Sequence, residues 1–573
     1  MSPVSTRRSP CPVHERFSAQ VERAPDAIAL ISESQRLTYR ELDSAANRLA
    51  QLLRAEGVRD GYAVALCFER STNAILALLA ILKAGGAYVP LDPTHPAERQ
   101  SRMLRVSGAR LILTDAGSRR ALPPFDGPLL LLDDMQARLE SMPATAPDVR
   151  VSANDRAYIM FTSGSTGEPN GVEVAHRGID RLVHDVTYVE LGPQQTLLHA
   201  APLAFDASTF EIFGALLTGG TLVIHPEPVP TARGLGAAIS RFGVTTMWLT
   251  AGLFNAVIDE APEQLVGLAQ LLVGGEALSV AHIKRAQAVL RGTQLINGYG
   301  PTETTTFAAC YRIPELLSDE LTSIPIGHAI TETALYVLSE ERRPVEPGVL
   351  GELYIGGDGV ALGYQGRPDL TAERFLPDPF APPGRLMYKT GDLVRQLASG
   401  AIEYVGRVDT QVKIDGHRIE PGEIEAVLRQ HPAVRDCAVT TMASGPFLVR
   451  RLVAYIVRGT DAPDQIGSDV LRAHLQATLP AYMVPHAFVD LPRLPLTPNG
   501  KVDLRALPEA PAERAVVGAW EEPRAGMEKI IAEIVAELLG VPHVGTRDSF
   551  ADLGFTSLLV VRAVERLRSR HAL

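Results

Sequence analysis

Cysteine is scarce in this sequence. Its four cysteines lie far apart among 573 residues and show no short metal-ligand spacing: Cys11, Cys67, Cys310 and Cys437. A disulfide framework and a zinc ribbon are both unsupported, because each needs several cysteines at close, regular spacing. We therefore expect a protein of the reducing cytoplasm.

Long apolar runs are also absent. The longest uncharged apolar run, Ala74 to Leu82, ends at Lys83, and it is about half as long as the roughly 20 residues that cross a bilayer. The N-terminal segment MSPVSTRRSP leads into no apolar stretch of the signal-peptide kind. The sequence predicts neither export nor membrane anchoring.

Basic charge is not in excess. Lysine and arginine number 55 against 66 acidic residues, which gives a net charge of −11 at pH 7. Tight binding to nucleic acid depends largely on basic residues that neutralise phosphates, so we expect no nucleic-acid partner. With 46% hydrophobic and 21% charged residues, the composition is that of a globular protein of several domains.

The order of predicted elements indicates an α/β fold. The run AVALC at 63–67 predicts a buried strand, and 74–83 predicts a helix that ends before Gly85 and Gly86. Similar alternation continues to about residue 400. Residues 1–407 are therefore predicted to form one large layered unit.

Three smaller regions follow. Residues 403–416 read as a polar hairpin and 421–431 as an amphipathic helix, so a smaller α+β unit is predicted over 408–507. Residues 508–523, rich in proline, alanine and charge, predict a linker. Two amphipathic stripes then predict a small helical module over 524–573.

One loop carries the strongest local signal for chemistry. A strand-like run leads into small and hydroxyl residues within YIMFTSGSTGEPNGV, at 158–172. Glycine permits the backbone conformations that let several N–H groups approach one anion, so the loop predicts phosphate binding. It lacks the GK[ST] ending of a nucleoside triphosphatase loop. A plain surface turn is the alternative. The expected phosphate-binding residues are Thr162, Ser163, Gly164, Ser165, Thr166 and Gly167.

With this loop the sequence resembles the adenylate-forming enzymes, and among them the amino-acid adenylation domains of nonribosomal peptide synthetases. The resemblance runs from Thr38 onward through motifs in one order. Beside the loop they are LKAGGAYVPLDP (82–93), FDASTFEIFGALLTGG (205–220), NGYGPTE (297–303), GELYIGGDGVALGY (351–364), YKTGDLVR (388–395), GRVDTQVKIDGHRIEPGEIE (406–425), LPAYMVP (479–485) and LPLTPNGKVDL (494–504).

The resemblance implies a reaction in two halves. An amino-acid carboxylate attacks the α-phosphorus of ATP and pyrophosphate leaves; a thiol then takes the aminoacyl group. Glu303 would bind Mg²⁺, a hard cation suited to a carboxylate, while Thr302 and Tyr299 would contact the nucleotide. Asp392 would accept hydrogen bonds from the ribose hydroxyls with help from Arg407. A solvated glutamate and a structural Asp392–Arg407 ion pair are the alternatives.

The resemblance also implies that the smaller unit moves. Lys501 would bridge the substrate carboxylate and the α-phosphate during the first half, because it cancels repulsion between two anions. Asp409 matches the hinge of the family. Rotation there would withdraw Lys501 and bring 406–416 to the adenylate, where Lys413 would contribute. A solvated strand lysine is the alternative for Lys413.

The chain departs from the family pattern at one position after the loop. The family usually has Pro-Lys-Gly there, whereas this chain has Pro169-Asn170-Gly171. A missing ammonium could slow the departure of pyrophosphate. Asn170 therefore motivates one alternative function, a catalytically weak nucleotide-binding scaffold. A second alternative is an acyl-CoA or aryl-CoA ligase.

Asp206 distinguishes an amino-acid ligase from these CoA ligases. By resemblance its carboxylate pairs the α-ammonium of the substrate, a group that fatty acids lack. Apart from Asp206 and Lys501 the pocket carries no charge, so the resemblance implies a small branched apolar amino acid, with L-valine as the first candidate and isoleucine or leucine as weaker substrates. The other pocket residues are Ala207, Phe210, Trp248, Leu272, Gly274, Gly298, Thr306 and Phe307.

The tail DSFADLGFTSLL, at 548–559, resembles the attachment motif of peptidyl carrier proteins. Ser557 would carry 4′-phosphopantetheine at a helix N-terminus, with a plain helix cap as the alternative. Phe555 and Thr556 depart from the usual motif. The resemblance implies a phosphopantetheinyl transferase, a downstream synthetase or tailoring enzyme, and a small activating protein as possible partners. Because a carrier is a four-helix bundle, we expect only part of one here.

Overall fold

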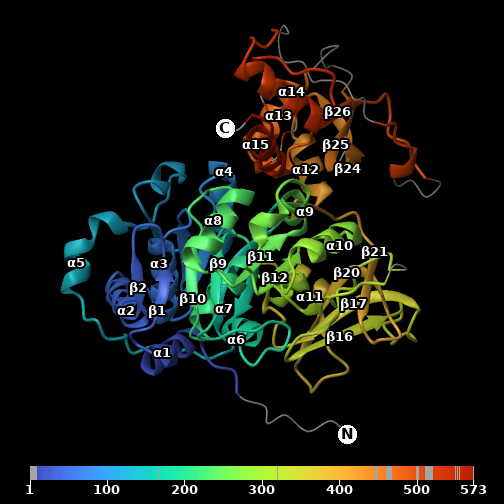
Figure 1. The fold of residues 1–573 in the computed structure, drawn as a ribbon. Coiled ribbons are helices and arrows are strands. Elements are labelled where there is room, and N and C mark those ends of the chain that lie inside the picture. Colours follow the sequence, from blue (N-terminus) through green and yellow to red (C-terminus); the bar gives the residue numbers. More distant parts are fainter. Residues whose placement is uncertain are drawn as a thin grey trace.

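The computed structural model divides into a large N-terminal subdomain, a smaller subdomain and a C-terminal pair of helices (Figure 1). This is the α/β architecture that the sequence predicted. The structure describes residues 9–164, 167–318, 321–444, 449–459, 467–497, 502–509, 521–548, 550, 553, 555 and 557–571.

Two large sheets form the centre of the large subdomain. In spatial order, the strands of one are β18 (Gly363–Tyr364), β8 (Asn170–Ala175), β7 (Arg156–Thr162), β4 (Ala87–Leu91), β3 (Ala63–Cys67), β5 (Ile112–Thr114) and β6 (Leu129–Leu131). Those of the other are β15 (His328–Ala329), β14 (Ala309–Arg312), β13 (Gln294–Tyr299), β12 (Gln270–Gly274), β11 (Thr246–Thr250), β9 (Thr196–His199), β10 (Thr221–Ile224), β1 (Ile28–Ile31) and β2 (Arg36–Thr38).

A third sheet of five strands completes this subdomain: β16 (Thr333–Leu338), β17 (Leu350–Gly357), β20 (Leu386–Gln396), β19 (Phe375–Pro377) and β21 (Ile402–Arg407). Its helices are α1 (Val13–Arg23), α2 (Tyr39–Ala55), α3 (Thr72–Lys83), α4 (Ala97–Ser107), α5 (Gln136–Ser141), α6 (His176–Val183), α7 (Ala207–Leu216), α8 (Ala232–Phe242), α9 (Ala251–Glu260), α10 (Val280–Val289) and α11 (Pro368–Arg374).

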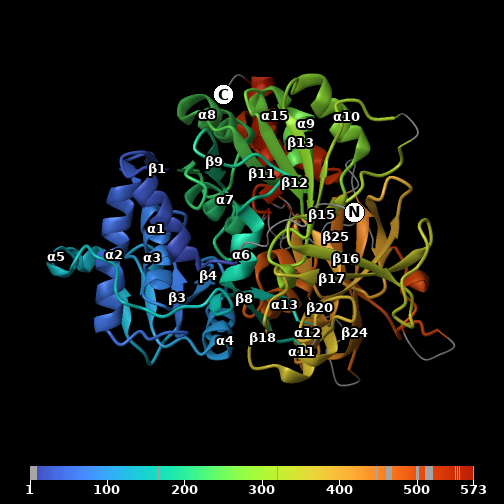
Figure 2. The ribbon, with the colours of Figure 1, turned by 90° about the horizontal axis from the view of Figure 1, so that it is seen from below.

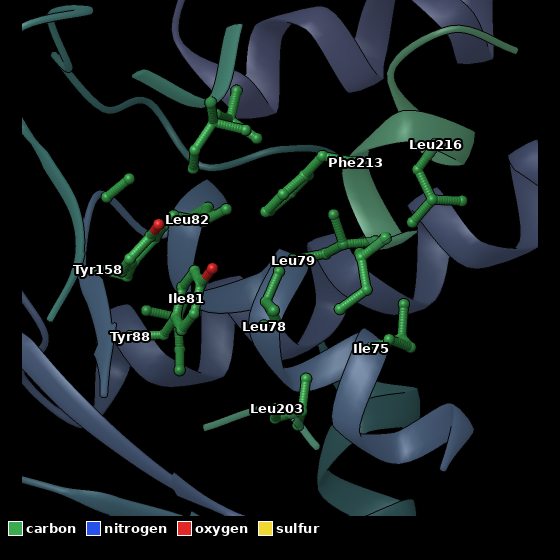
Figure 3. Close-up of a cluster of buried hydrophobic side chains, with 14 of the residues drawn as sticks. Ile75, Leu78, Leu79, Ile81, Leu82, Tyr88, Tyr158, Leu203, Phe213 and Leu216 are labelled. Carbon is green, nitrogen blue, oxygen red and sulfur yellow. The ribbon is translucent and has the colours of Figure 1, made fainter. Parts of the chain in front are cut away.

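Helix α3 shows how the sequence builds the core. The Ser71 side chain accepts a hydrogen bond from the Ala74 N–H and begins the helix. The helix is apolar all round, as expected for one that is buried between other elements. Its side chains, Leu78 and Leu79 among them, meet Phe213 of α7 in one continuous cluster (Figure 3).

The smaller subdomain follows β21. It contains the hairpin β22 (Val412–Ile414) and β23 (His417–Ile419), the sheet β24 (Val434–Ser444), β25 (Val449–Arg458) and β26 (Ala487–Asp490), and the helices α12 (Pro421–Leu428) and α13 (Ser468–Gln476). The predicted hairpin over 403–416 was wrong, because β21 pairs with β20 and the hairpin lies over 412–419. The predicted helix over 421–431 ends at Leu428, and Pro432 disfavours helical backbone just before it.

The C-terminal module contains α14 (Met527–Leu539) and α15 (Ser557–His571). Both helices match predicted amphipathic stripes, and α14 ends at Gly540, whose φ of +70° suits glycine. They share an apolar cluster that includes Leu538 and Leu559. Among the described residues, no helix combines enough length and apolar character to cross a membrane.

The core around α3 yields a stability prediction. Phe213→Ala removes a fully buried ring, and we expect it to lower the free energy of unfolding of the large subdomain by about 3–5 kcal/mol. Calorimetry would measure this as a lower melting temperature. Leu316→Ala is the control, because Leu316 is 90% exposed; equal melting temperatures for the two variants would contradict the role assigned to this core.

Candidate active site

The small subdomain inserts its β22–β23 hairpin into a cleft of the large subdomain. Lys413 and Arg418 of this hairpin line a cavity of about 70 Å³ together with Asp206 and Gly298. A neighbouring cavity of about 500 Å³ also contains Lys413. The cleft lies where β11, β12 and β13 reach their carboxyl ends, the edge at which parallel sheets usually bind ligands.

The predicted phosphate loop connects the antiparallel strands β7 and β8. Thr162 and Ser163 are buried, and Gly167 has a φ of +86°. The Gly164 N–H donates to Glu423 Oε2 at 3.0 Å, and the Ser163 hydroxyl donates to the Arg418 carbonyl at 2.7 Å. A carboxylate of the small subdomain therefore occupies the loop. Ser165 and Thr166 lie outside the described residues.

Asn170, which replaces the usual lysine, begins β8 under this loop. It pairs with Thr162 across the two strands. A methyl group added at Gly164 would lie 3.1 Å from the Asn170 amide nitrogen and 2.1 Å from the Glu168 carbonyl. The loop therefore folds closely over the Asn170 side chain, and only glycine fits at 164.

Glu303 is fully buried in a short 3₁₀ turn over Thr302–Thr304. Arg418 Nη1 contacts both of its oxygens, at 2.9 and 2.8 Å, and the Tyr364 hydroxyl donates to Oε1 at 2.7 Å. Burial by itself raises the pKa of Glu303, but Arg418 and Tyr364 outweigh it and hold the pKa below its usual value. Glu303 is thus an ionised carboxylate paired with a cation, not a solvated side chain.

Asp392 lies on β20 and pairs with Arg407 of the neighbouring strand β21. The Tyr299 hydroxyl donates to the other Asp392 oxygen. Arg407 also contacts both oxygens of Asp409, at 2.6 and 2.8 Å. The ion pair weighed as the structural alternative is therefore present, and Asp409 joins it at the boundary between the subdomains.

The two lysines expected in catalysis differ in their placement. Lys413 lines both cavities, and its ammonium lies 5.9 Å from the centre of the Tyr299 ring. Burial lowers the pKa of Lys413, whereas Asp392 and Asp206 act in the opposite direction. Lys413 is thus a cleft residue, and the solvated-strand alternative is wrong. Lys501 lies outside the described residues.

Asp206 lies at the start of α7 and borders the 70 Å³ cavity. It accepts a hydrogen bond from the Thr302 hydroxyl at 2.8 Å, and its backbone carbonyl accepts one from Thr306 at 2.8 Å. Burial raises the pKa of Asp206, while the Thr302 hydrogen bond and Lys413 lower it. A cationic group entering the cavity would stabilise this carboxylate.

The remaining pocket residues fall into two groups. Those that line the cavity with Asp206 are Ala207, Trp248, Gly298, Thr306 and Phe307. Phe210, Leu272 and Gly274 neighbour them: Phe210 packs against Phe307 with ring centres 5.4 Å apart, Leu272 pairs with Trp248, and Gly274 pairs with Gly298.

Gly274 and Gly298 leave little open space in the pocket. A methyl group on Gly298 would lie 2.7 Å from the Phe307 ring, and one on Gly274 would lie 2.3 Å from the Gly298 carbonyl. Glycine is required because the Phe307 ring and two backbone strands approach closely there. The aromatic ring fills the space that the missing side chains leave.

A largely apolar cavity of about 210 Å³ adjoins this site. Phe205 and Trp248 line both cavities, and Leu558 and Val561 of α15 line the far part. Helix α15 begins at Ser557, next to Leu558. His417 also borders the cavity. Burial lowers the pKa of His417 to about 4, so that its ring is neutral at pH 7. The cavity thus lies between the substrate site and the first turns of α15.

Arg418 and Glu423 were not selected by the sequence reasoning, although both stand in the quoted motif GRVDTQVKIDGHRIEPGEIE. Glu423 is fully buried and pairs with Arg99 of α4 at 2.8 Å. A buried charge must be paired. The sequence signal was therefore a charged residue on the apolar face of α12, but its partner lies more than three hundred residues away.

These residues fit ATP, Mg²⁺ and phosphopantetheine. The Thr162 hydroxyl is buried and has no hydrogen-bond partner within the described parts of the chain. Gly164 holds an anion and Glu303 holds a cation, both supplied by the small subdomain in this arrangement. A phosphate and a metal ion have charges of the same sign as these two side chains, and each would have to displace its counterpart.

Comparisons with protein families match parts of all three regions of this arrangement. The AMP-binding enzyme family matches residues 17–365, the AMP-binding enzyme C-terminal domain 423–501, and the phosphopantetheine attachment site 529–573. Linear gramicidin synthase subunits C and B of Brevibacillus parabrevis are each 46% identical over 96% and 95% of the chain. The chain spans only 7% and 10% of those proteins.

Solved structures of adenylation and carrier domains resemble this chain. One is holo-PA1221, a protein containing adenylation and PCP domains bound to a vinylsulfonamide inhibitor: it is 33% identical, with a TM-score of 0.83 over 98% of this chain and 92% of that one. The artificially fused NpsA-ThdA di-domain from Klebsiella oxytoca has 32% identity and a TM-score of 0.76 over 84% and 94%. This chain therefore belongs to the AMP-binding enzymes, as a nonribosomal peptide synthetase adenylation domain, an amino-acid adenylating ligase, joined to a phosphopantetheine carrier domain.

Proposed function

We propose that this chain activates a small branched apolar amino acid, L-valine first, with ATP and loads it onto its own carrier domain. One observation carries the proposal: the cavity bordered by Asp206 adjoins the apolar cavity that reaches α15 beside Ser557. We place the functional boundaries at about residues 407, 507 and 523. A phosphopantetheinyl transferase and a downstream synthetase domain are the partners that this activity needs.

In the first half of the reaction the chain must hold the phosphates of ATP and the substrate carboxylate close together, although all of them are negatively charged. We expect the N–H groups and hydroxyls of 162–167 to bind the phosphates, and Mg²⁺ on Glu303 would neutralise phosphate charge. Asp206 pairs the substrate ammonium and leaves the carboxylate free to react. We assign to Lys501 the ammonium that bridges this carboxylate and the α-phosphate. Arg418 must leave Glu303 before a metal can bind there, so we expect the small subdomain to sit differently in this half.

In the second half the described arrangement is the productive one. Phosphopantetheine on Ser557 supplies the thiol that accepts the aminoacyl group. The largely apolar lining of the 210 Å³ cavity, with Phe205 and Trp248 among its residues, would shield the arm from water. Lys413 lies in the cleft near Asp392, where a protonated ammonium would stabilise the negative charge that develops on the leaving AMP.

Substrate choice rests on the shape of the small cavity. The rings of Trp248 and Phe307 border it, and Phe210 supports Phe307 from behind. A charged side chain would be buried there without a partner, and a long or aromatic one would collide with these rings. Discrimination against one extra methylene is worth about 1–3 kcal/mol, so isoleucine and leucine should react more weakly.

Pyrophosphate exchange into ATP tests this proposal. We expect exchange to be stimulated most by valine, less by isoleucine or leucine, and not by lysine, glutamate, a fatty acid or an aryl acid. Asp206→Asn should reduce valine-dependent exchange by at least about a hundred-fold, because the ammonium loses a buried charged partner. Asp26→Asn is the matched control, since Asp26 is 83% exposed. Stimulation of pyrophosphate exchange by a fatty or aryl acid would favour a CoA ligase. No stimulation by any acid would favour a catalytically weak scaffold.

The two lysines should separate the half-reactions. Lys501→Ala should abolish exchange but leave carrier loading from synthetic aminoacyl adenylate. Lys413→Ala should slow that loading and leave exchange within about two-fold, because its charge acts only when the hairpin lies in the cleft. Single-turnover loading, followed by mass spectrometry of the intact protein, measures both. Equal loss of both steps in either variant would contradict the division.

Ser557→Ala should remove covalent loading completely and keep exchange unchanged, because the variant has no hydroxyl to receive phosphopantetheine. Ser569→Ala, on the same helix with its hydroxyl bonded to the Arg566 carbonyl, should load normally. Labelled amino acid that still appears on the Ser557 variant would assign attachment to another residue.

A further inference from the structure

The carrier helix α15 lies directly against α9 of the large subdomain, and the two helices stay side by side in both ribbon views (Figures 1 and 2). They belong to domains that are far apart in the sequence. Part of the contact is the apolar cavity that contains Leu558 and Val561. Charged residues of the two helices make the rest of the contact.

Two arginines of α15 meet two acids in the last turn of α9. Arg562 Nη2 lies 2.6 Å from Asp259 Oδ2, and its Nη1 lies 3.4 Å from Glu260 Oε1. Arg566 Nη2 lies 3.1 Å from the same Glu260 oxygen. The side chains are largely shielded from water, with exposures of 6% for Arg562, 12% for Arg566, 17% for Asp259 and 13% for Glu260. Charges at this depth are less screened than a surface pair.

The position of the acids indicates that they serve a partner. The carboxyl end of a helix carries partial negative charge, so acidic residues in the last turn destabilise the helix that bears them. Helix α9 ends in Asp259 and Glu260 and has no basic residue in that turn. Asp259 is also held by Arg285 of α10. The arginines of α15 supply compensating charge to both acids.

We propose that Arg562 and Arg566 with Asp259 and Glu260 form an electrostatic latch by which the adenylation domain recognises its own carrier domain. Basic residues lie on the carrier side and acidic residues on the adenylation side, so a carrier with acids at the positions of Arg562 and Arg566 is rejected. The latch holds α15 so that its first turn, with Leu558, borders the apolar cavity. This inference rests on the proposed carrier loading and adds the residues that select the carrier.

The latch predicts a loading defect without an activation defect. In the full-length holo-protein, Arg562→Gln/Arg566→Gln should slow single-turnover loading by about three- to ten-fold, because ion pairs shielded from water favour the docked state. Valine-dependent exchange should stay unchanged. Arg547→Gln/Arg568→Gln removes the same charge from the carrier, at residues paired with Glu521 and Glu565, and should load at the wild-type rate.

A double-mutant cycle assigns the effect to this contact. Glu260→Gln alone should slow loading. Added to Arg562→Gln/Arg566→Gln, the same substitution should reduce the loading rate by a much smaller factor than it does in the wild type. Raising salt from about 0.05 to about 0.5 M should slow wild-type loading and leave the triple variant nearly unaffected. Loading at the wild-type rate in Arg562→Gln/Arg566→Gln at low salt, with normal exchange, would overturn the latch.

Amide hydrogen exchange gives a reading that does not need activity. Arg562→Gln alone is used here, because Arg566 also pairs with Glu537 of α14 at 2.8 Å. Residues 251–260 should exchange amide hydrogens faster in Arg562→Gln than in the Arg547→Gln/Arg568→Gln control, whereas α14 should exchange alike in both if the carrier is folded. Equal protection of 251–260 in the two variants would also overturn the latch. If no amino acid stimulates pyrophosphate exchange in the wild type, the proposed function fails. Amide hydrogen exchange still decides whether the latch exists.

Discussion

The buried ion pair between Arg418 and Glu303 is the constraint on which the observed arrangement depends. Glu303 belongs to the large subdomain and is fully buried, so its charge requires a partner. Arg418 comes from the small subdomain. Because one guanidinium contacts both oxygens, a metal ion at Glu303 and the observed position of the small subdomain exclude each other.

The phosphate loop obeys the same rule. Glu423 presents a carboxylate to the Gly164 N–H and is held there by Arg99. An anion and a cation of the small subdomain thus occupy the places where we propose that a phosphate and a metal bind. The chain keeps these charged groups paired in the described state, and binding of nucleotide and metal would supply replacement partners. One site can therefore serve two half-reactions without leaving a buried charge unpaired.

Two aromatic residues lie between the small cavity and the apolar cavity. Phe205 and Trp248 border both the small cavity of Asp206 and the apolar cavity of the carrier. His417 stacks on Tyr482 with ring centres 3.9 Å apart, which fixes the hairpin beside them. The amino-acid pocket, the hairpin and the carrier helix thus meet at one group of rings, and α15 is held against the large subdomain by both apolar and charged contacts.

By itself, the sequence determined the α/β class, strand β3, helix α3, the two C-terminal helices and the motifs of the cleft, because periodicity, glycine and short motifs act locally. It also placed Asp206, Glu303 and Asp392 in one family pattern. Only the tertiary structure decided that Arg418 pairs with Glu303, that the Phe307 ring packs against Gly298, and that acids of α9 meet arginines of α15. Each of these contacts joins residues whose separation depends on how the sheets and subdomains pack, and no local pattern encodes that packing.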